Sequence, residues 1–221
     1  MPLRKLTNPA SFSADKSADN ARKEGFMQKT KSYEGKIFKD VALENKTLLN
    51  HEFEDCVFEG CSFVCTTFKG CVFKSCTFVR CRLADVKNEG SDFKECTFKG
   101  CNLLSISWAD VFTRNSVMPS VARLEGCCIK YGVFSRVNFG KFDFSGNDVV
   151  DSMFSDCRLS RSSFKDCNLK FTEFLRCDIT EADFRGASGY KVELATCKMK
   201  GARFSFPEVV NLLNGLGIEI E

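Results

Sequence analysis

The sequence predicts an all-β solenoid in which the chain turns a corner every five residues. From Phe38 to Trp108 every fifth position is large and apolar in fourteen of fifteen cases, with Asn88 as the exception. The same period runs from Leu124 to Phe204, one residue out of phase. A period of 5.0 matches neither the 3.6 of a helix nor the 2.0 of a strand. The composition agrees, because 23 Phe against 3 Tyr and 1 Trp indicates selection for one side-chain shape.

The residue two places before each large position is usually small. Twelve of the fourteen Cys occupy this second position, where a compact and weakly polar side chain packs well. One large and one small residue per pentapeptide would fill a narrow, square interior without overpacking it. The predicted core stack includes Phe58, Phe63, Phe68, Phe73, Phe78, Phe93, Phe98, Phe154, Phe164, Phe174 and Phe184.

Stretches such as CTFKG, CNLKF, CDITE and ADFRG resemble the A(D/N)LXX consensus of the pentapeptide-repeat family. The resemblance covers residues 34–206 and implies a right-handed quadrilateral β-helix with four pentapeptides per coil. Strand-like spacing would place successive coils about 4.8 Å apart. Because each coil buries its faces only against its neighbours, the ends of such a solenoid need caps.

The flanking segments differ from the repeat body. Residues 1–33 are polar and aperiodic, so we expect a mobile leader. In residues 207–221, Pro207 suits a first helical position, and Val209, Leu212 and Leu213 share one face of a short capping helix. The final residues alternate apolar and acidic side chains, with Ile218 and Ile220 on one side, as in a short strand. The bacterial Qnr quinolone-resistance proteins resemble this segment, and the resemblance implies a homodimer paired through the C-terminus.

The repeat register breaks at residues 109–123. One interpretation is a bulge or short loop that the solenoid tolerates. The other is a projecting interaction loop carrying Arg114, Asn115 and Pro119, because some Qnr-like proteins have such a loop near mid-chain. Those proteins also have an earlier loop, whereas residues 38–108 run without interruption here.

Catalytic and metal-binding patterns are weak. His51, the sole histidine, falls at a small inward position without a recognisable catalytic partner. Cys residues twenty apart stack with parallel Cβ directions, a poor geometry for a disulfide. Zinc usually takes ligands at short CxxC or HxxxH spacing, and the only adjacent pair, Cys127 and Cys128, points in opposite directions on a strand. No Gly-rich phosphate loop occurs. We therefore predict no enzymatic activity, no cofactor and no metal site.

The sequence has no signal-peptide pattern and no long apolar run, so we expect a cytoplasmic protein with reduced thiols and no membrane association. The net charge of +3 is concentrated at the start: residues 1–33 hold seven basic and three acidic side chains, which leaves 25 basic and 26 acidic elsewhere. This balance argues against direct nucleic-acid binding, which depends on neutralising phosphates.

Two functions remain. The first is a rigid scaffold that binds a protein partner through its outer faces. The alternative, implied by the Qnr resemblance, is a DNA mimic that binds DNA gyrase or topoisomerase IV and confers quinolone resistance. A DNA mimic needs a strong acidic field, which the nearly neutral repeat body does not supply as a whole. Local acidic faces around Glu52, Glu54, Asp55 and Glu59 could still supply it.

Overall fold

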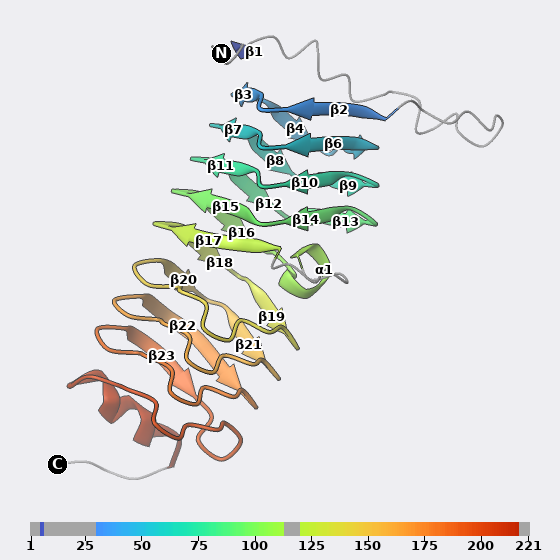
Figure 1. Cartoon of the computed structure of the whole chain (residues 1–221). Helices are drawn as coiled ribbons and strands as arrows, with labels where there is room; N and C mark the ends of the chain where they lie inside the picture. Colours follow the sequence, from blue (N-terminus) through green and yellow to red (C-terminus); the bar gives the residue numbers. More distant parts are fainter. Residues whose placement is uncertain (1–4, 7–29, 113–119, 217–221) are drawn as a thin grey trace. The chain divides into compact units, whose positions relative to one another are not determined.

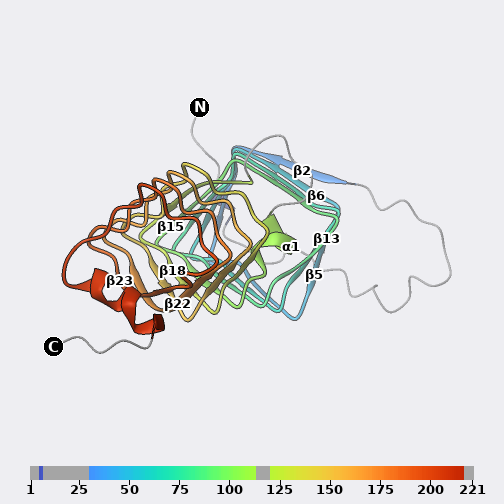
Figure 2. The ribbon, with the colours of Figure 1, turned by 90° about the horizontal axis from the view of Figure 1, so that it is seen from below.

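The computed structural model describes residues 5–6, 30–112 and 120–216. It contains two compact units, one formed by residues 1–101 and 110–123 and the other by residues 102–109 and 124–221. Each unit is a right-handed parallel β-solenoid with four sides, which confirms the predicted fold class. The strands of each unit stack in Figure 1, and Figure 2 shows the coils end-on.

Four stacks of short parallel strands form the sides of the first unit. Their pairing joins residues twenty apart, for example Phe53 with Phe73 and Phe73 with Phe93. The strands are β2 (Lys31–Glu34), β6 (His51–Glu54), β10 (Val72–Lys74) and β14 (Asp92–Lys94); β3 (Ile37–Lys39), β7 (Val57–Glu59), β11 (Thr77–Val79) and β15 (Cys96–Lys99); β4 (Ala42–Glu44), β8 (Ser62–Val64) and β12 (Arg82–Ala84); and β5 (Thr47–Leu49), β9 (Thr67–Lys69) and β13 (Lys87–Glu89).

Within the predicted leader the structure describes a short strand near the start and, from residue 30 on, the chain that enters β2. Lys5 and Leu6 form β1 (Lys5–Leu6), which runs parallel to β3 and pairs with Ile37 and Phe38. Residues 7–29 lie outside the described part of the chain. The first full strand, β2, begins at Lys31, three residues before the expected boundary at residue 34.

The second unit has two sides made of strands and two made of single bridges. Asn138, Arg158, Asp178 and Lys198 form one row of bridges, and Asp143, Ser163, Asp183 and Arg203 form the other. The strands are β16 (Asn102–Leu104), β18 (Cys128–Lys130), β19 (Val133–Ser135), β20 (Asp148–Val150), β21 (Met153–Ser155), β22 (Asn168–Leu175) and β23 (Ser188–Val192).

The register break is an insertion of six residues. Asn102 pairs with Cys128 and Ser107 bridges Val133, an offset of 26 instead of the usual 20. Six is one pentapeptide plus one residue, which is why the sequence shows a phase slip of one. The inserted segment contains α1 (Trp108–Phe112), and β17 (Val121–Glu125) follows it.

A second irregularity, which the sequence period hides, lies in the last coil. Asn168 pairs with Ser188 but Thr172 pairs with Tyr190, so two residues are missing there. Tyr190 and Val192 therefore fill the interior, whereas the period assigned large inward positions to Gly189 and Leu194. Gly189 has a φ of +74°, and a Cβ there would lie 2.7 Å from the Cα of Lys170, so only glycine fits the shortened turn.

Stacked rings form the core of each unit. In the first unit the ring centroids of Phe58 and Phe78 lie 4.8 Å apart and nearly parallel, and neighbouring sides meet edge-to-face. In the second unit Phe154 and Phe174 are also 4.8 Å apart. All eleven phenylalanines of the predicted core stack are buried. Burial of roughly 150–250 Å² per aromatic side chain makes this stack the main source of stability in each unit.

Candidate protein-interaction surface

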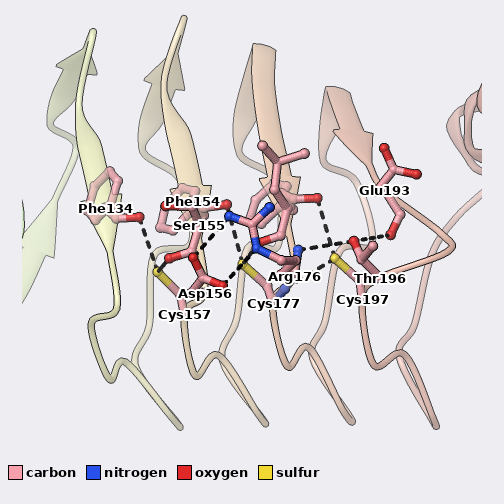
Figure 3. A network of polar contacts seen from close by, with 12 residues as sticks. Phe134, Phe154, Ser155, Asp156, Cys157, Arg176, Cys177, Glu193, Thr196 and Cys197 are labelled. Atoms are coloured by element: carbon pink, nitrogen blue, oxygen red, sulfur yellow. Dashed lines mark hydrogen bonds and ion pairs between the residues drawn. The ribbon is translucent and has the colours of Figure 1, made fainter.

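The small inward side chains form a hydrogen-bonded ladder, which the sequence interpretation as packing alone did not anticipate. The Cys157 thiol donates to the carbonyl oxygen of Phe134 at 3.3 Å, and Cys177 donates to that of Phe154 at 3.4 Å (Figure 3). In both cases the bond reaches back 23 residues, from a small position to a large one in the preceding coil. The sequence does indicate this ladder, because Cys, Ser and Thr fill the small inward positions more often than Ala, whose side chain cannot donate a hydrogen bond.

Some of these side chains also accept a bond from the backbone N–H twenty residues earlier. Thr172 Oγ1 accepts from the N–H of Ser152 at 3.2 Å and donates to the Val149 carbonyl at 2.7 Å. Asn147, which occupies the same kind of position, accepts from the Cys127 N–H at 2.7 Å. Buried polar groups must find partners. The ladder therefore satisfies backbone groups at corners where the strand pairing does not reach.

Most of the cysteines, and the one histidine, lie in this interior, whereas Cys65 and Cys128 point outward. All fourteen cysteines are free thiols, and burial raises the pKa of Cys96 and of Cys167 to about 12. His51 is buried at the start of the first unit, its Nδ1 is 2.6 Å from the Leu49 carbonyl oxygen, and burial lowers its pKa. Among the described residues no three His, Cys, Asp or Glu side chains gather as a metal site. None of the described helices is long and apolar enough to cross a membrane.

The predicted interaction loop can be placed only at its base. Arg114, Asn115 and Pro119 lie outside the described residues. At the base, Asn88 donates 2.9 Å hydrogen bonds to the carbonyl oxygens of Ser91 and Val111 and accepts one of 2.7 Å from the Ser91 N–H. Asn88, the polar exception in the core series, therefore connects the last turn of α1 to the solenoid.

The C-terminal cap is present as a 3₁₀ helix, η3 (Glu208–Leu216), which packs against β23. Val209, Leu212 and Leu213 are half-buried in it. Ile218 and Ile220, the predicted dimerisation residues, lie outside the described part of the chain.

Opposite charges pair along the outer faces. Glu59 contacts both Lys39 and Arg80, and the hydrogen bond from Lys39 holds the pKa of Glu59 below its usual value. Glu54 pairs with Lys74 one coil away. In the second unit Arg176 holds Asp156 at 2.8 Å, as Figure 3 shows, and Arg161 holds Glu181 at 2.8 Å. These faces therefore present mixed charge.

One corner of the second unit carries exposed apolar side chains. Tyr131 is 54% exposed and Phe171 is 68% exposed, and Val133 and Met153 lie beside them at 40% and 37%. Of the five large hydrophobic side chains that are exposed in the described residues, four lie at this corner. We call these four residues the aromatic corner. The five-residue period does not indicate this corner, because the period describes the inward positions only.

The residues of the aromatic corner come from three successive coils. Val133 of β19 pairs with Met153 of β21, and Met153 pairs with Glu173 of β22. Tyr131 and Phe171 occupy the same turn position two coils apart, with Asp151 between them. Contiguous exposed apolar patches on a folded domain are typical of binding surfaces.

Solved structures similar to the chain have low sequence identity to it. A trypsin-treated variant of QnrB1, a plasmid-mediated fluoroquinolone resistance protein, is 18% identical over 86% of this chain and 90% of that one, with a TM-score of 0.46. HetL, a pentapeptide repeat protein involved in heterocyst differentiation regulation from the cyanobacterium Nostoc sp., is 13% identical over 83% and 88%, with a TM-score of 0.36. No curated protein matches the chain.

Family models match both units. The model for pentapeptide repeats in eight copies matches residues 52–87, and the model for a pentapeptide repeat region matches residues 129–205. Together these ranges cover just over half of the chain, and in both the fifth-residue period coincides with four-sided coils. The chain therefore belongs to the pentapeptide-repeat family.

Proposed function

We propose that this chain is a non-enzymatic, cytoplasmic scaffold that binds a partner protein through its outer faces. The aromatic corner carries this proposal, because two aromatic and two aliphatic side chains stay in water where the repeat normally places polar turn residues. Packing does not require them there. A partner that covers them would supply the missing burial.

The interior supports a role without catalysis. Its thiols and hydroxyls, such as those of Cys157 and Thr172, bond to backbone carbonyls. A nucleophile needs a neighbouring base within hydrogen-bond reach and access to a substrate. Most inward side chains are thiols, hydroxyls and phenyl rings, and the one inward imidazole, that of His51, is buried with its Nδ1 2.6 Å from the Leu49 carbonyl oxygen.

A DNA mimic that binds DNA gyrase or topoisomerase IV is the alternative function. It would need continuous, unopposed negative charge along one face. Glu54 and Glu59 pair with Lys74, Lys39 and Arg80, and this pairing favours the scaffold. A gyrase supercoiling assay with and without ciprofloxacin distinguishes the two functions. We expect no effect at micromolar protein, and restored or inhibited supercoiling would support the mimic.

The scaffold itself is tested by lysine-reactive cross-linking in cells that naturally produce the chain, followed by mass spectrometry. We expect abundant cross-links between outward lysines and one other protein species. If no lysine of either unit cross-links to another protein, the scaffold proposal is wrong.

The proposal includes pairing of two copies through the C-terminal cap. Val209, Leu212 and Leu213 are only half-buried in η3, which leaves apolar surface at this end of the second unit. Sedimentation velocity should give the mass of a dimer for the wild type and of a monomer for Leu213→Asp. A wild-type monomer at 100 μM, a concentration on the order of the Kd of a weak dimer, would remove this part of the proposal.

A further inference from the structure

We propose that the aromatic corner is a docking site for an amphipathic helix of the partner protein, with an acidic residue of that helix facing Lys170. This inference rests on the proposed scaffold function and specifies its partner. It depends on the backbone at the corner, the area of the patch, its spacing and its charge.

The backbone shows that the two aromatic residues stand at an unfavourable position. Tyr131 has a φ of +56° and Phe171 a φ of +59°, both in the left-handed region. Twenty non-glycine residues of the described chain have a positive φ, and the other eighteen are polar, charged or Cys. Left-handed conformations favour Gly, Asn and Asp, and a bulky residue there is an outlier. Local strain of this kind concentrates at functional sites.

The exposed apolar area of the corner favours a short segment of a partner protein over a second copy of the chain. A fully buried Tyr or Phe removes roughly 150–250 Å² from water, so two half-exposed rings with two aliphatic neighbours offer on the order of 300 Å². A stable interface needs about 800 Å² from each partner. A second copy of the chain would have to bury much more than this patch. A short segment that inserts a few anchors would cover it.

The spacing of the corner selects a helix over a strand. Tyr131 and Phe171 lie two coils apart at one turn position, hence about 9.6 Å apart along the solenoid. Two turns of an α-helix rise about 10.8 Å, so apolar residues at i, i+3 or i+4, and i+7 would meet successive coils. Same-side residues of a strand repeat every 6.8 Å or so, which fits the coils poorly.

The charges at the corner specify an acidic residue. Lys170 lies over the Phe171 ring, 5.1 Å from its centroid, and makes no ion pair within the described residues. Its neighbours are neutralised, since Lys130 is 3.9 Å from Asp151 and Lys191 is 2.9 Å from Glu173. A carboxylate on the helix would complement Lys170. An anionic membrane fits less well, because Asp151 and Glu173 would face its headgroups.

A displayed library of 16-residue helical peptides, selected against the full-length chain, tests the proposal. Selected peptides should carry apolar residues at i, i+3 or i+4, and i+7 with a flanking Asp or Glu. Their affinity should fall at least tenfold for Tyr131→Asn/Phe171→Asn. The matched control is Lys141→Asn, an exposed residue with a φ of +64° at another corner of the same unit, which should leave affinity unchanged.

Three results would overturn the helix. In the first, the selected peptides lack helical spacing or bind the double variant as tightly as the wild type. In the second, the wild type binds phosphatidylglycerol vesicles and the double variant does not. In the third, the wild type is a dimer and the double variant is a monomer. The cross-linking experiment separates this proposal from the scaffold. Partner cross-links at Lys39 or Lys94 but not at Lys130 or Lys170 would leave the scaffold standing and exclude the corner.

Discussion

The Nδ2 atom of Asn88 donates a 2.9 Å hydrogen bond to the carbonyl oxygen of Val111, across 23 residues of sequence. The same amide also bonds both backbone groups of Ser91. Asn88 sits in the stack that Phe68 and Leu48 continue, where the repeat would place another apolar residue. The loss of one core side chain thus provides the anchor for the inserted α1 segment.

We expect Asn88→Leu to destabilise the protein although it restores the repeat pattern. The substitution leaves the Val111 carbonyl and the Ser91 N–H without the amide, and each unsatisfied buried group costs about 1–3 kcal/mol. Urea denaturation should show a loss of about 2 kcal/mol in the free energy of unfolding. Leu48→Met in the same stack is the control and should cost less than about 1.5 kcal/mol. A more stable Asn88→Leu protein would contradict the anchoring role.

Thr172→Val tests the inward ladder, since it keeps side-chain shape and removes only the hydroxyl. The Ser152 N–H then has no acceptor and the Val149 carbonyl loses a donor at 2.7 Å. We expect a loss of about 1–3 kcal/mol in the free energy of unfolding. Thr172→Ser keeps both bonds and should lose only about 0.8 kcal/mol, the value of one buried methylene-sized group. If Thr172→Val and wild type were equally stable, the inward side chains would stabilise the solenoid by packing and not by their hydrogen bonds.

The five-residue period predicted a chain that turns a corner every five residues, and the family resemblance added the four sides that bring residues such as Phe58 and Phe78 into one stack. The period located the break but not its size, since an insertion of six and one of one residue give the same phase. The shortened turn at Gly189 compensates within a few residues and leaves the later register intact. The aromatic corner could not be predicted from the period, because the period identifies the side chains that point inward and gives no information about the exposed ones.

Thiol labelling should separate the two outward cysteines from the twelve inward ones. Cys65 is exposed at a corner of the first unit and Cys128 is partly exposed on β18. Burial raises the pKa of Cys128, so its thiolate is scarcer. In native protein at pH 8 we expect iodoacetamide to modify Cys65 first and Cys128 more slowly, as peptide mass spectrometry would record. The protein in urea should react at all fourteen. Rapid native labelling of Cys96 or Cys167 would contradict the closed interior.

Acid should weaken the second unit through Asp183. Hydrogen bonds from Arg185, with Nη2–Oδ2 at 2.6 Å, lower the pKa of Asp183 from 3.8 to about 2. Because the folded-state pKa is the lower one, this stabilisation is complete above pH 4 or so and is lost as the pH falls through 2. The full shift corresponds to about 2 kcal/mol, and the half-exposed guanidinium reduces it to about 1 kcal/mol.

Unfolding of Arg185→Gln should therefore show a deficit of about 1 kcal/mol at pH 6 that vanishes near pH 2. Lys165→Gln, in the same column one coil earlier, is the control and should change stability by less than about 0.5 kcal/mol. A deficit of equal size at both pH values would assign the effect of Arg185 to packing instead of charge.

We expect the two aromatic residues of the corner to lower the stability of the folded chain slightly. Replacing Tyr131 and Phe171 by Asn relieves two left-handed bulky residues, worth about 1 kcal/mol each, and removes cation–π contacts with Lys130 and Lys170 worth about 0.5 kcal/mol each. The double variant should therefore unfold at the same temperature as wild type or about 2–4 °C higher, while losing affinity for its partner. Residues selected only for stability would behave oppositely, because their replacement would lower Tm. A fall of more than about 5 °C would mean that these rings serve the solenoid and not a partner.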